Sequence, residues 1–167
     1  KNQTINITSR TLNELHNVEN TSNISLANNL YLKIDKESII SSLENIKFDV
    51  LCHSLMEFIS IENGPVKRTN NLVWEIGTER FENAIKRTPI TGVCIGFNTL
   101  SKVDYSFTSK LFNCTLNTVS QIASTSELNE LSNGLRTIAR LNLRFAIKIY
   151  NSPNINLNKL ALESNNY

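Results

Sequence analysis

Apolar positions recur with the spacing of an amphipathic α-helix over much of the chain. One series runs from residue 48 to residue 59, a second from 105 to 122 and a third from 126 to 150. Asp35 is a good N-cap for a shorter helix that continues to Leu43. Ser126 and Asn129 have short polar side chains of the kind favoured at the start of a helix, and they stand where the third series begins. The pattern therefore predicts a mainly α protein with a compact helical core.

Two segments interrupt this helical pattern. Residues 70–77, NNLVWEIG, are rich in side chains that favour strands and overlap a plausible turn at residues 68–71, so we predict a small β-hairpin here. Residues 90–100 are apolar and contain two glycines, which favours a buried irregular segment or short strand over a long helix. Asn63-Gly64-Pro65 is expected to end the helical series that begins at residue 48. Residues 79–86 fit one or two helical turns, which Thr88-Pro89 is expected to end.

The two ends of the chain differ from its middle. Residues 1–30 are dense in Asn, Ser and Thr, and the alternation in QTINITS (residues 3–9) suits an extended strand lying on another surface. A loose terminus is an equally good interpretation of this segment. Pro153 is expected to end the last long helix. We therefore predict an extended N-terminal arm (1–30), a helical core (31–152) and a C-terminal segment (153–167).

Composition agrees with a single folded domain but identifies no partner. The 167 residues are 40% hydrophobic and 19% charged, which suits a packed core. A net charge of +2 is too small to indicate a nucleic-acid binder, so any such site must be local. No apolar run approaches the roughly 18 residues that cross a bilayer. Three distant cysteines favour a reducing compartment over a disulfide framework or a zinc site.

The residues that could carry catalysis are few and lie in no recognisable motif. His16 and His53 are the only histidines. Cys52 and His53 are neighbours on a predicted helix, where adjacent side chains point about 100° apart. Cys52 is therefore expected in the core, and His53 on the surface or in the wall of a groove. The pairs Glu57 with Glu62 and Glu79 with Glu82 are expected to be solvated helix faces. We predict a protein that is not an enzyme and that uses no cofactor or metal.

Four basic residues recur at intervals of four near the C-terminal end of the third predicted helix. They are Arg136, Arg140, Arg144 and Lys148, and no acidic residue occurs between Glu130 and Glu163. Each step of four advances about 40° around a helix, so the four cations form a slanted band opposite the apolar face. A bound phosphodiester backbone would satisfy this band. Solvent, or acidic residues from elsewhere in the fold, would also satisfy it.

Several short segments are similar to the coat proteins of potyviruses. Residues 142–150, NLRFAIKIY, resemble without a gap the coat-protein segment that reads approximately LARYAFDFY. Residues 61–64, IENG, followed ten residues later by Trp74, resemble the family segment that contains WCIENG and then a tryptophan. Ser106-Phe107 and the helix after it are similar to the family's TFRQ helix. The matches keep the family's order over residues 56–150.

The sequence also departs from the family at two positions. Lys148 stands where the family has aspartate, and Thr108 stands where it has arginine; both family residues are linked to the RNA groove or its supporting network. A divergent relative, or the coat protein of another flexible filamentous plant virus, is therefore as good an interpretation as a potyvirus.

The resemblance implies a structural subunit that polymerises helically around single-stranded RNA. It implies that the N-terminal arm docks on a neighbouring subunit, that the C-terminal segment runs toward the inside of the filament, and that the protein occurs in the virion and the host cytoplasm. RNA would be held through phosphate contacts with little base reading. Arg144 is an RNA-binding candidate by its position in the resemblance. Helix geometry adds Arg136, Arg140, Lys148 and Lys110, and Ser109 is a candidate polar donor.

Other functions remain open at this point. The nucleoprotein of a segmented negative-strand RNA virus would use a similar helical core and an exchanged arm. A secreted helical-bundle effector would use the same amphipathic helices without binding RNA, and glycosylation of its five N-x-S/T sequences would favour it. An unrecognised enzyme would need a cleft with perturbed titratable groups.

Overall fold

The computed structural model of the chain describes residues 4–17, 21–41, 43, 45–62, 68–153 and 155. These residues form helices and contain no strand. The helices are α1 (Thr4–His16), α2 (Thr21–Lys33), α3 (Lys36–Ser41), α4 (Phe48–Ile61), α5 (Arg68–Lys86), α6 (Ile90–Val103), α7 (Tyr105–Ser124), α8 (Leu128–Leu141) and α9 (Leu143–Tyr150). The prediction of a mainly α protein is confirmed.

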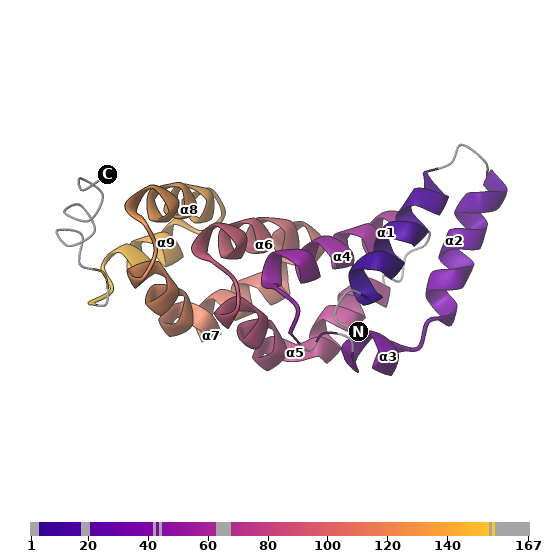
Figure 1. Ribbon diagram of the computed structural model, residues 1–167, viewed down its shortest axis with the longest axis horizontal. Helices are drawn as coiled ribbons and strands as arrows, with labels where there is room; N and C mark the ends of the chain where they lie inside the picture. Colours follow the sequence, from indigo (N-terminus) through magenta and orange to yellow (C-terminus); the bar gives the residue numbers. More distant parts are fainter. Residues whose placement is uncertain are drawn as a thin grey trace.

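The helices build an elongated body whose middle is formed by α4 and α6 (Figure 1). Helix α1 packs on α4 and on α2, so the first helices lie at one end of the long axis. Helices α8 and α9 lie at the other end, where α8 packs on α6 and α9 packs on both α7 and α8. Helices α5 and α7 pack against each other along the lower side of the view.

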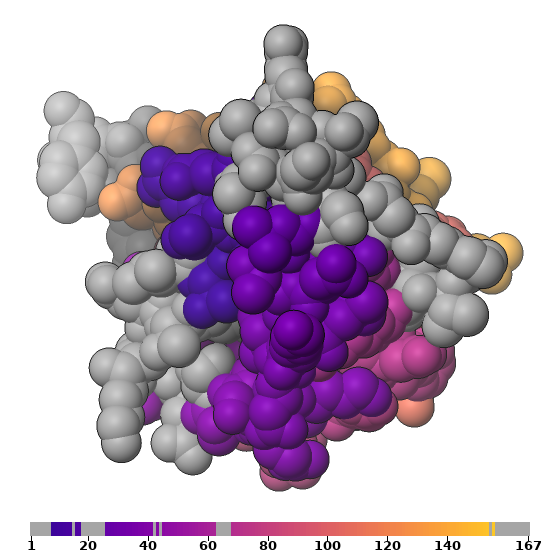
Figure 2. Space-filling view, turned by 90° about the vertical axis from the view of Figure 1, so that its right-hand side faces the viewer, coloured from indigo at the N-terminus to yellow at the C-terminus, as the bar shows by residue number. Residues whose placement is uncertain are grey.

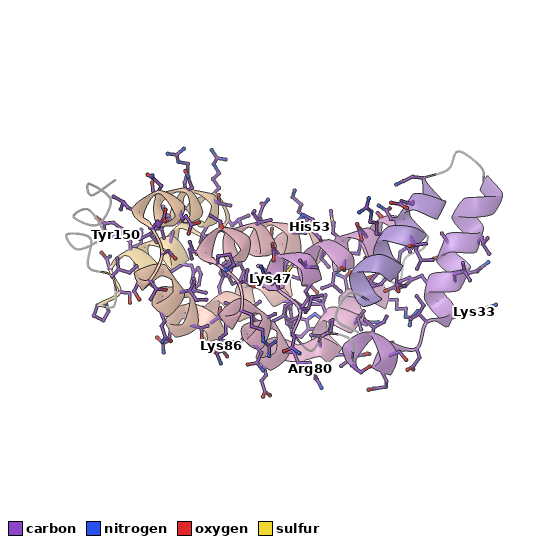
Figure 3. All side chains as sticks on the ribbon, viewed as in Figure 1. Lys33, Lys47, His53, Arg80, Lys86 and Tyr150 are labelled. Atoms are coloured by element: carbon purple, nitrogen blue, oxygen red, sulfur yellow. The ribbon has the colours of Figure 1, made fainter. Side chains whose placement is uncertain are left out.

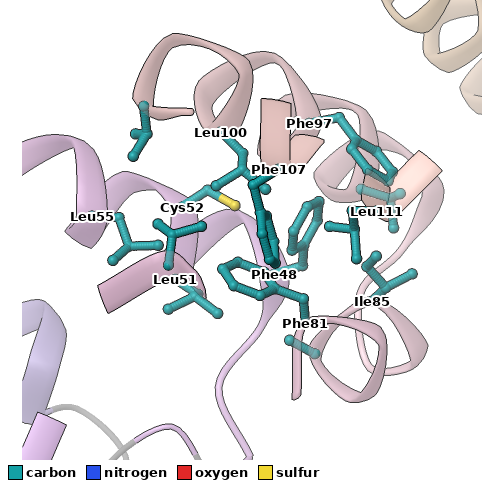
Figure 4. Packing of buried hydrophobic residues seen from close by; sticks show 14 of the residues in the cluster. Phe48, Leu51, Cys52, Leu55, Phe81, Ile85, Phe97, Leu100, Phe107 and Leu111 are labelled. Carbon is teal, nitrogen blue, oxygen red and sulfur yellow. The ribbon is translucent and has the colours of Figure 1, made fainter. Parts of the chain in front are cut away.

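A chain of contacting aromatic rings runs through the core and joins these layers, and Figure 4 shows its first two members, Phe48 and Phe97. Phe48 of α4 contacts Phe97 of α6, with ring centroids 5.0 Å apart. Phe97 stacks on Phe112 of α7 at 4.4 Å, and Phe112 contacts Phe145 of α9 at 4.5 Å. All four rings are buried. The position of α9 is therefore fixed by direct ring contacts that lead back to α4.

The predicted β-hairpin at residues 68–77 is wrong, because this segment begins helix α5. Leu72, Val73 and Ile76 are buried with helical spacing, whereas Trp74 is exposed. Burial of this face overrides the strand preference of Val, Ile and Trp. The helix is interrupted at Gly77, whose φ of 75° and ψ of 158° are accessible to glycine and strained for other residues.

The expectation of an irregular segment or strand at residues 90–100 is also wrong, because the segment is the first part of helix α6. Gly96 lies where α6 meets α4, and Gly92 lies beside Thr88 of the segment that joins α5 to α6. A Cβ added to Gly96 would lie 2.4 Å from Cδ1 of Phe48, and one added to Gly92 would lie 2.7 Å from Cγ2 of Thr88. These glycines therefore allow helices to approach closely and do not end the helix.

The extended N-terminal arm is not supported either, because residues 4–16 and 21–33 are helical. Leu12 of α1 is buried in the core. Tyr31 of α2 is also buried, stacks on Phe58 with centroids 4.6 Å apart, and its hydroxyl lies 2.8 Å from Oγ1 of Thr69. The Arg68 guanidinium donates hydrogen bonds to the backbone carbonyls of Tyr31 and Ile34. These contacts attach the N-terminal segment to the rest of the fold.

The predicted helix ends are partly correct. Oδ2 of Asp35 accepts a hydrogen bond from the Ser38 backbone N–H at 2.9 Å, as expected of an N-cap, although α3 ends at Ser41. Ser126 does not cap α8, because its hydroxyl donates to the carbonyl of Ile122. The predicted stop at residues 63–65 lies outside the described residues. So does the predicted C-terminal segment, apart from Pro153 and Ile155.

Candidate nucleic-acid interface

Helix α8 turns one face to the core and the opposite face to solvent. Its buried residues are Leu131, Gly134 and Ile138. At about 100° per residue, Arg136 and Arg140 point roughly 150–170° away from the centre of this buried face. Both arginines are exposed. The sequence-based assignment of these two residues to a solvent-facing surface therefore agrees with the structure.

Two asparagines that the sequence analysis did not select as RNA-binding candidates share this outer face. Asn129 and Asn133 are exposed and precede Arg136 and Arg140 with steps of three and four residues, so all four side chains lie along one side of α8. Amide groups supply donors and acceptors beside the cations. The helical periodicity that selected the arginines would have found the asparagines as well.

The predicted continuous helix from 126 to 150 is wrong, because it is divided at Asn142. The backbone of Asn142 is extended, with φ −150° and ψ 91°, and its side chain accepts a hydrogen bond from the Phe145 backbone N–H at 3.0 Å. Asn142 is thus the N-cap of α9. Arg136 and Arg140 lie before the break, while Arg144 and Lys148 lie after it. The single slanted band becomes two pairs on two successive helices.

Helix α9 presents three different faces around its axis. Phe145, Ala146 and Ile149 are buried. Arg144 and Lys148 are exposed, one helical turn apart, on a second face. Leu143, Ile147 and Tyr150 are exposed large apolar residues on a third face. The basic pair therefore lies between the buried face and the exposed apolar face of α9.

No acidic side chain neutralises these four cations within the described part of the chain. The ion pairs found there are Arg10–Glu14, Lys36–Glu75 and Lys86–Glu82. Residues 105–153 carry five basic and two acidic residues, a net charge of +3, so the remainder of the chain has a net charge of −1. The charge excess of the protein is therefore concentrated in α7, α8 and α9. We call Arg136, Arg140, Arg144 and Lys148 the α8–α9 cations.

The two candidates on α7 have different surroundings. The Lys110 ammonium lies over the ring of Trp74, 5.1 Å from its centroid, so this cation has a partner on α5. Ser109 is half-buried and lies one turn before Phe112, which contacts Phe145 of α9. No contact described for Lys110 joins it to the α8–α9 cations. The sequence analysis placed Trp74 in the predicted hairpin and in the family resemblance, and neither of these pairs it with Lys110.

Cys52, His53 and Cys94 lie in surroundings that do not activate a thiol. Cys52 is buried and His53 is exposed, as predicted, with Nδ1 of His53 2.9 Å from the carbonyl oxygen of Asp49. Burial raises the pKa of the Cys94 thiol to about 12. Burial, and then the nearby Asp49 charge, raise the pKa of the Cys52 thiol well above its usual value. Neither buried thiol is an activated nucleophile.

Three of the four glutamates expected on solvated faces accept hydrogen bonds from other elements, whereas Glu79 is exposed, as the sequence suggested. Oε1 of Glu62 accepts hydrogen bonds from both the backbone N–H and the hydroxyl of Thr69, each at 2.7 Å. Glu57 accepts from Ser9, and Glu82 accepts from Thr118, both at 2.5 Å. Over the described ranges, no three His, Cys, Asp or Glu side chains gather closely enough to hold a metal ion.

Comparisons of the chain with known protein families, with curated proteins and with solved structures gave no match. Among the described residues, no helix has both the length and the apolar character that crossing a bilayer requires.

Proposed function

We propose that this protein is a structural subunit that coats single-stranded RNA, the role of a capsid protein in a filamentous virus. The observation that carries the proposal is the set of α8–α9 cations. All four are exposed, they lie on two successive helices, and no acidic residue in the described part of the chain pairs with them. An RNA backbone supplies a row of negative charges that would satisfy such a set.

The chemistry of this surface favours contact with phosphates over reading of bases. Arginine binds phosphate through two parallel hydrogen bonds, and three of the four cations are arginines. The amide groups of Asn129 and Asn133 are polar partners for sugar or phosphate oxygens. A coat subunit must bind every part of a genome, so binding through the backbone meets the functional requirement.

A nucleoprotein of a segmented negative-strand virus would use the same surface in the same way, and it is a variant of this proposal. A helical effector that leaves its cations solvated is a different class of protein. Affinity for RNA separates these classes, because a solvated basic face need not bind polyanions tightly or with a strong dependence on salt.

The test compares two variants with equal charge. In the first, all four α8–α9 cations are changed to alanine. In the second, four exposed cations from other parts of the molecule are changed to alanine, namely Lys33, Lys47, Arg87 and Lys102. Both variants carry the same net charge, so a difference between them reports the location of the site. Binding of the full chain to two labelled single-stranded RNAs of unrelated sequence is followed by fluorescence anisotropy over a range of salt concentrations.

We expect the first variant to lose at least tenfold in affinity for both RNAs. Loss of four phosphate contacts should also reduce the slope of log affinity against log salt by about 3, because each contact to a single strand contributes about 0.7. The second variant should retain most of the affinity. Equal losses in both variants, or absence of RNA binding by the unmodified protein, would contradict the proposal.

A further inference from the structure

Helix α9 carries an exposed apolar stripe. Leu143, Ile147 and Tyr150 are 60%, 48% and 51% exposed. Their spacing of four and then three residues places them within about 60° of each other around the helix. We call these three residues the α9 stripe. Exposed apolar side chains that gather along one side of a helix favour a surface that another molecule covers.

The other exposed large apolar residues of the described chain form no comparable surface. Leu30 and Leu32 of α2 point about 160° apart on their helix, so they do not share one side. Figure 2 looks onto this end of the molecule, where residues of α2 and α3 are visible. Trp74, Ile95 and Tyr105 lie singly on three different helices. Scattered apolar residues are normal on a protein surface, whereas the grouped residues of α9 need an explanation.

The aromatic member of the stripe is accessible to a ligand. Tyr150 ends α9 and lies near one end of the long axis, while Lys33, which ends α2, lies near the other (Figure 3). Within the described ranges, the Tyr150 side chain has no ring contact and no hydrogen bond. Trp74, by contrast, is held by contacts with α7. The exposed half of the Tyr150 ring is therefore available to a partner.

One row of side chains connects the stripe to the basic pair of α9. Arg144, Ile147 and Tyr150 follow each other at steps of three residues, and side chains at this spacing are neighbours on a helix. Each step moves about 60° round the helix and about 4.5 Å along it. The row thus begins with a cation, continues with an aliphatic residue and ends with an aromatic ring about 9 Å further along the axis.

A single RNA strand has the groups that match this row. Its phosphates are negatively charged, and its unpaired bases have flat faces that stack on aromatic side chains. No acidic residue in the described part of the chain pairs with Arg144, so this cation is available to a phosphate. An RNA duplex matches less well, because its base faces are covered by their neighbours in the stack. With a duplex bound, the α9 stripe would remain exposed to water.

We propose that Tyr150 stacks on an unpaired base of an RNA strand whose phosphate is held by Arg144, with Ile147 in apolar contact with the same strand. This inference rests on the proposed function and adds to it a preference for single-stranded over double-stranded RNA. Phosphate contacts alone would not give this preference, since a duplex also presents rows of phosphates. Stacking tolerates any sequence because every base has a π face, so it suits a protein that must cover a whole genome.

The test measures how the affinity depends on both the Tyr150 ring and the RNA bases. Two labelled probes of equal length are used: a uridine oligoribonucleotide, and an abasic oligoribonucleotide that has the same phosphates and no bases. Fluorescence anisotropy gives the ratio of the two affinities for the full chain and for its variants Y150A, Y150F and Y105A. Tyr105 is the matched control, because it is 63% exposed at the start of α7. Circular dichroism and thermal melting check that each variant is folded.

We expect the unmodified chain, Y150F and Y105A to bind the uridine probe at least about fivefold more tightly than the abasic probe, which is the lower end of the range for one base stack. Y150A should bring this ratio close to one and leave the affinity for the abasic probe unchanged. The preference of the unmodified chain for the uridine probe over its annealed duplex should also fall in Y150A.

Three results would overturn the inference and leave the proposed function standing: a ratio near one for the unmodified chain, an unchanged ratio in Y150A, or an equal fall of the ratio in Y105A. A Y150A variant that keeps the ratio but sediments as a smaller species would show that another copy of the protein covers the stripe, which also overturns the inference. If the unmodified protein binds neither probe, the proposed function itself is contradicted, and the inference with it.

Discussion

The ammonium group of Lys110 lies over the ring of Trp74, 5.1 Å from the ring centroid. The indole N–H of Trp74 donates to Oδ2 of Asp104 at 2.9 Å, and Oδ1 of Asp104 accepts from the Phe107 backbone N–H at 2.8 Å. One exposed tryptophan of α5 is thus connected to the first turn of α7. Lys110, which helix geometry alone made an RNA-binding candidate, thus has a partner, Trp74, within its own chain.

Removal of the Lys110–Trp74 contact should lower the free energy of unfolding and should have only a small effect on RNA affinity. We expect a double-mutant cycle of Trp74→Leu and Lys110→Met to give a coupling free energy of about 0.5–1 kcal/mol, as measured for exposed cation–π pairs. Urea unfolding of the two single variants and the double variant measures it. Lys110→Met should lower RNA affinity less than Arg144→Met does. Additive single effects would show that the contact contributes nothing.

Removing the N-cap of α9 should destabilise the protein and disturb its basic surface. We expect Asn142→Ala to lower the free energy of unfolding by about 1 kcal/mol, because the Phe145 N–H loses its acceptor. Asn142→Asp keeps an acceptor at this position and serves as the control. RNA affinity should fall in the alanine variant, since the orientation of Arg144 and Lys148 depends on where α9 begins. An alanine variant with unchanged stability would argue against the capping role.

Filling the close contact between α4 and α6 should cost stability. A Cβ at position 96 would lie 2.4 Å from Cδ1 of Phe48, which is buried and contacts the rings of Phe81 and Phe97. We expect Gly96→Ala to lower the free energy of unfolding by about 1–3 kcal/mol, the range typical of overpacked cores. Ile95→Ala, at an exposed neighbouring position on the same helix, is the control and should change stability by less than about 0.5 kcal/mol.

The three thiols should differ sharply in reactivity. Cys114 is exposed, whereas Cys52 and Cys94 are buried. Burial raises the pKa of Cys94 to about 12, so at pH 8 almost none of the reactive thiolate is present, and the fraction would increase only as the pH approached 12. We expect Ellman's reagent to modify one thiol rapidly in the native protein and three in denaturant. Cys114→Ser should remove the rapid phase, and rapid modification of two or more native thiols would contradict the described burial.

Much of the helical fold could be predicted because α4 and α7 follow local rules. Their apolar spacing is regular, and Asp104 provides α7 with a recognisable cap. Segments that depend on distant partners were predicted wrongly. Gly92 and Gly96 look like helix breakers until Thr88 and Phe48 are placed against them, and that contact cannot be read from the segment alone.

In the candidate site, too, the features set by local sequence were predicted and those set by other contacts were not. Exposure of Arg136 and Arg140 follows from helical periodicity, so the sequence predicted it correctly. The break between the two pairs of cations occurs at Asn142. The apolar pattern predicts that the helix continues through this residue, but the capping hydrogen bond of the Asn142 side chain favours a new helix start instead. The partner of Lys110 lies 36 positions away in sequence, beyond any local pattern.

Gly77 divides α5 into one part that carries Trp74 and another that carries Glu82 and its bond to Thr118. An added Cβ would meet no atom within 4 Å, so the position has room for a side chain. The backbone angles alone exclude one, since a φ of +75° with a ψ of 158° suits a residue without handedness. The direction in which the chain leaves Trp74 is therefore governed by stereochemistry at a single achiral carbon, and not by packing.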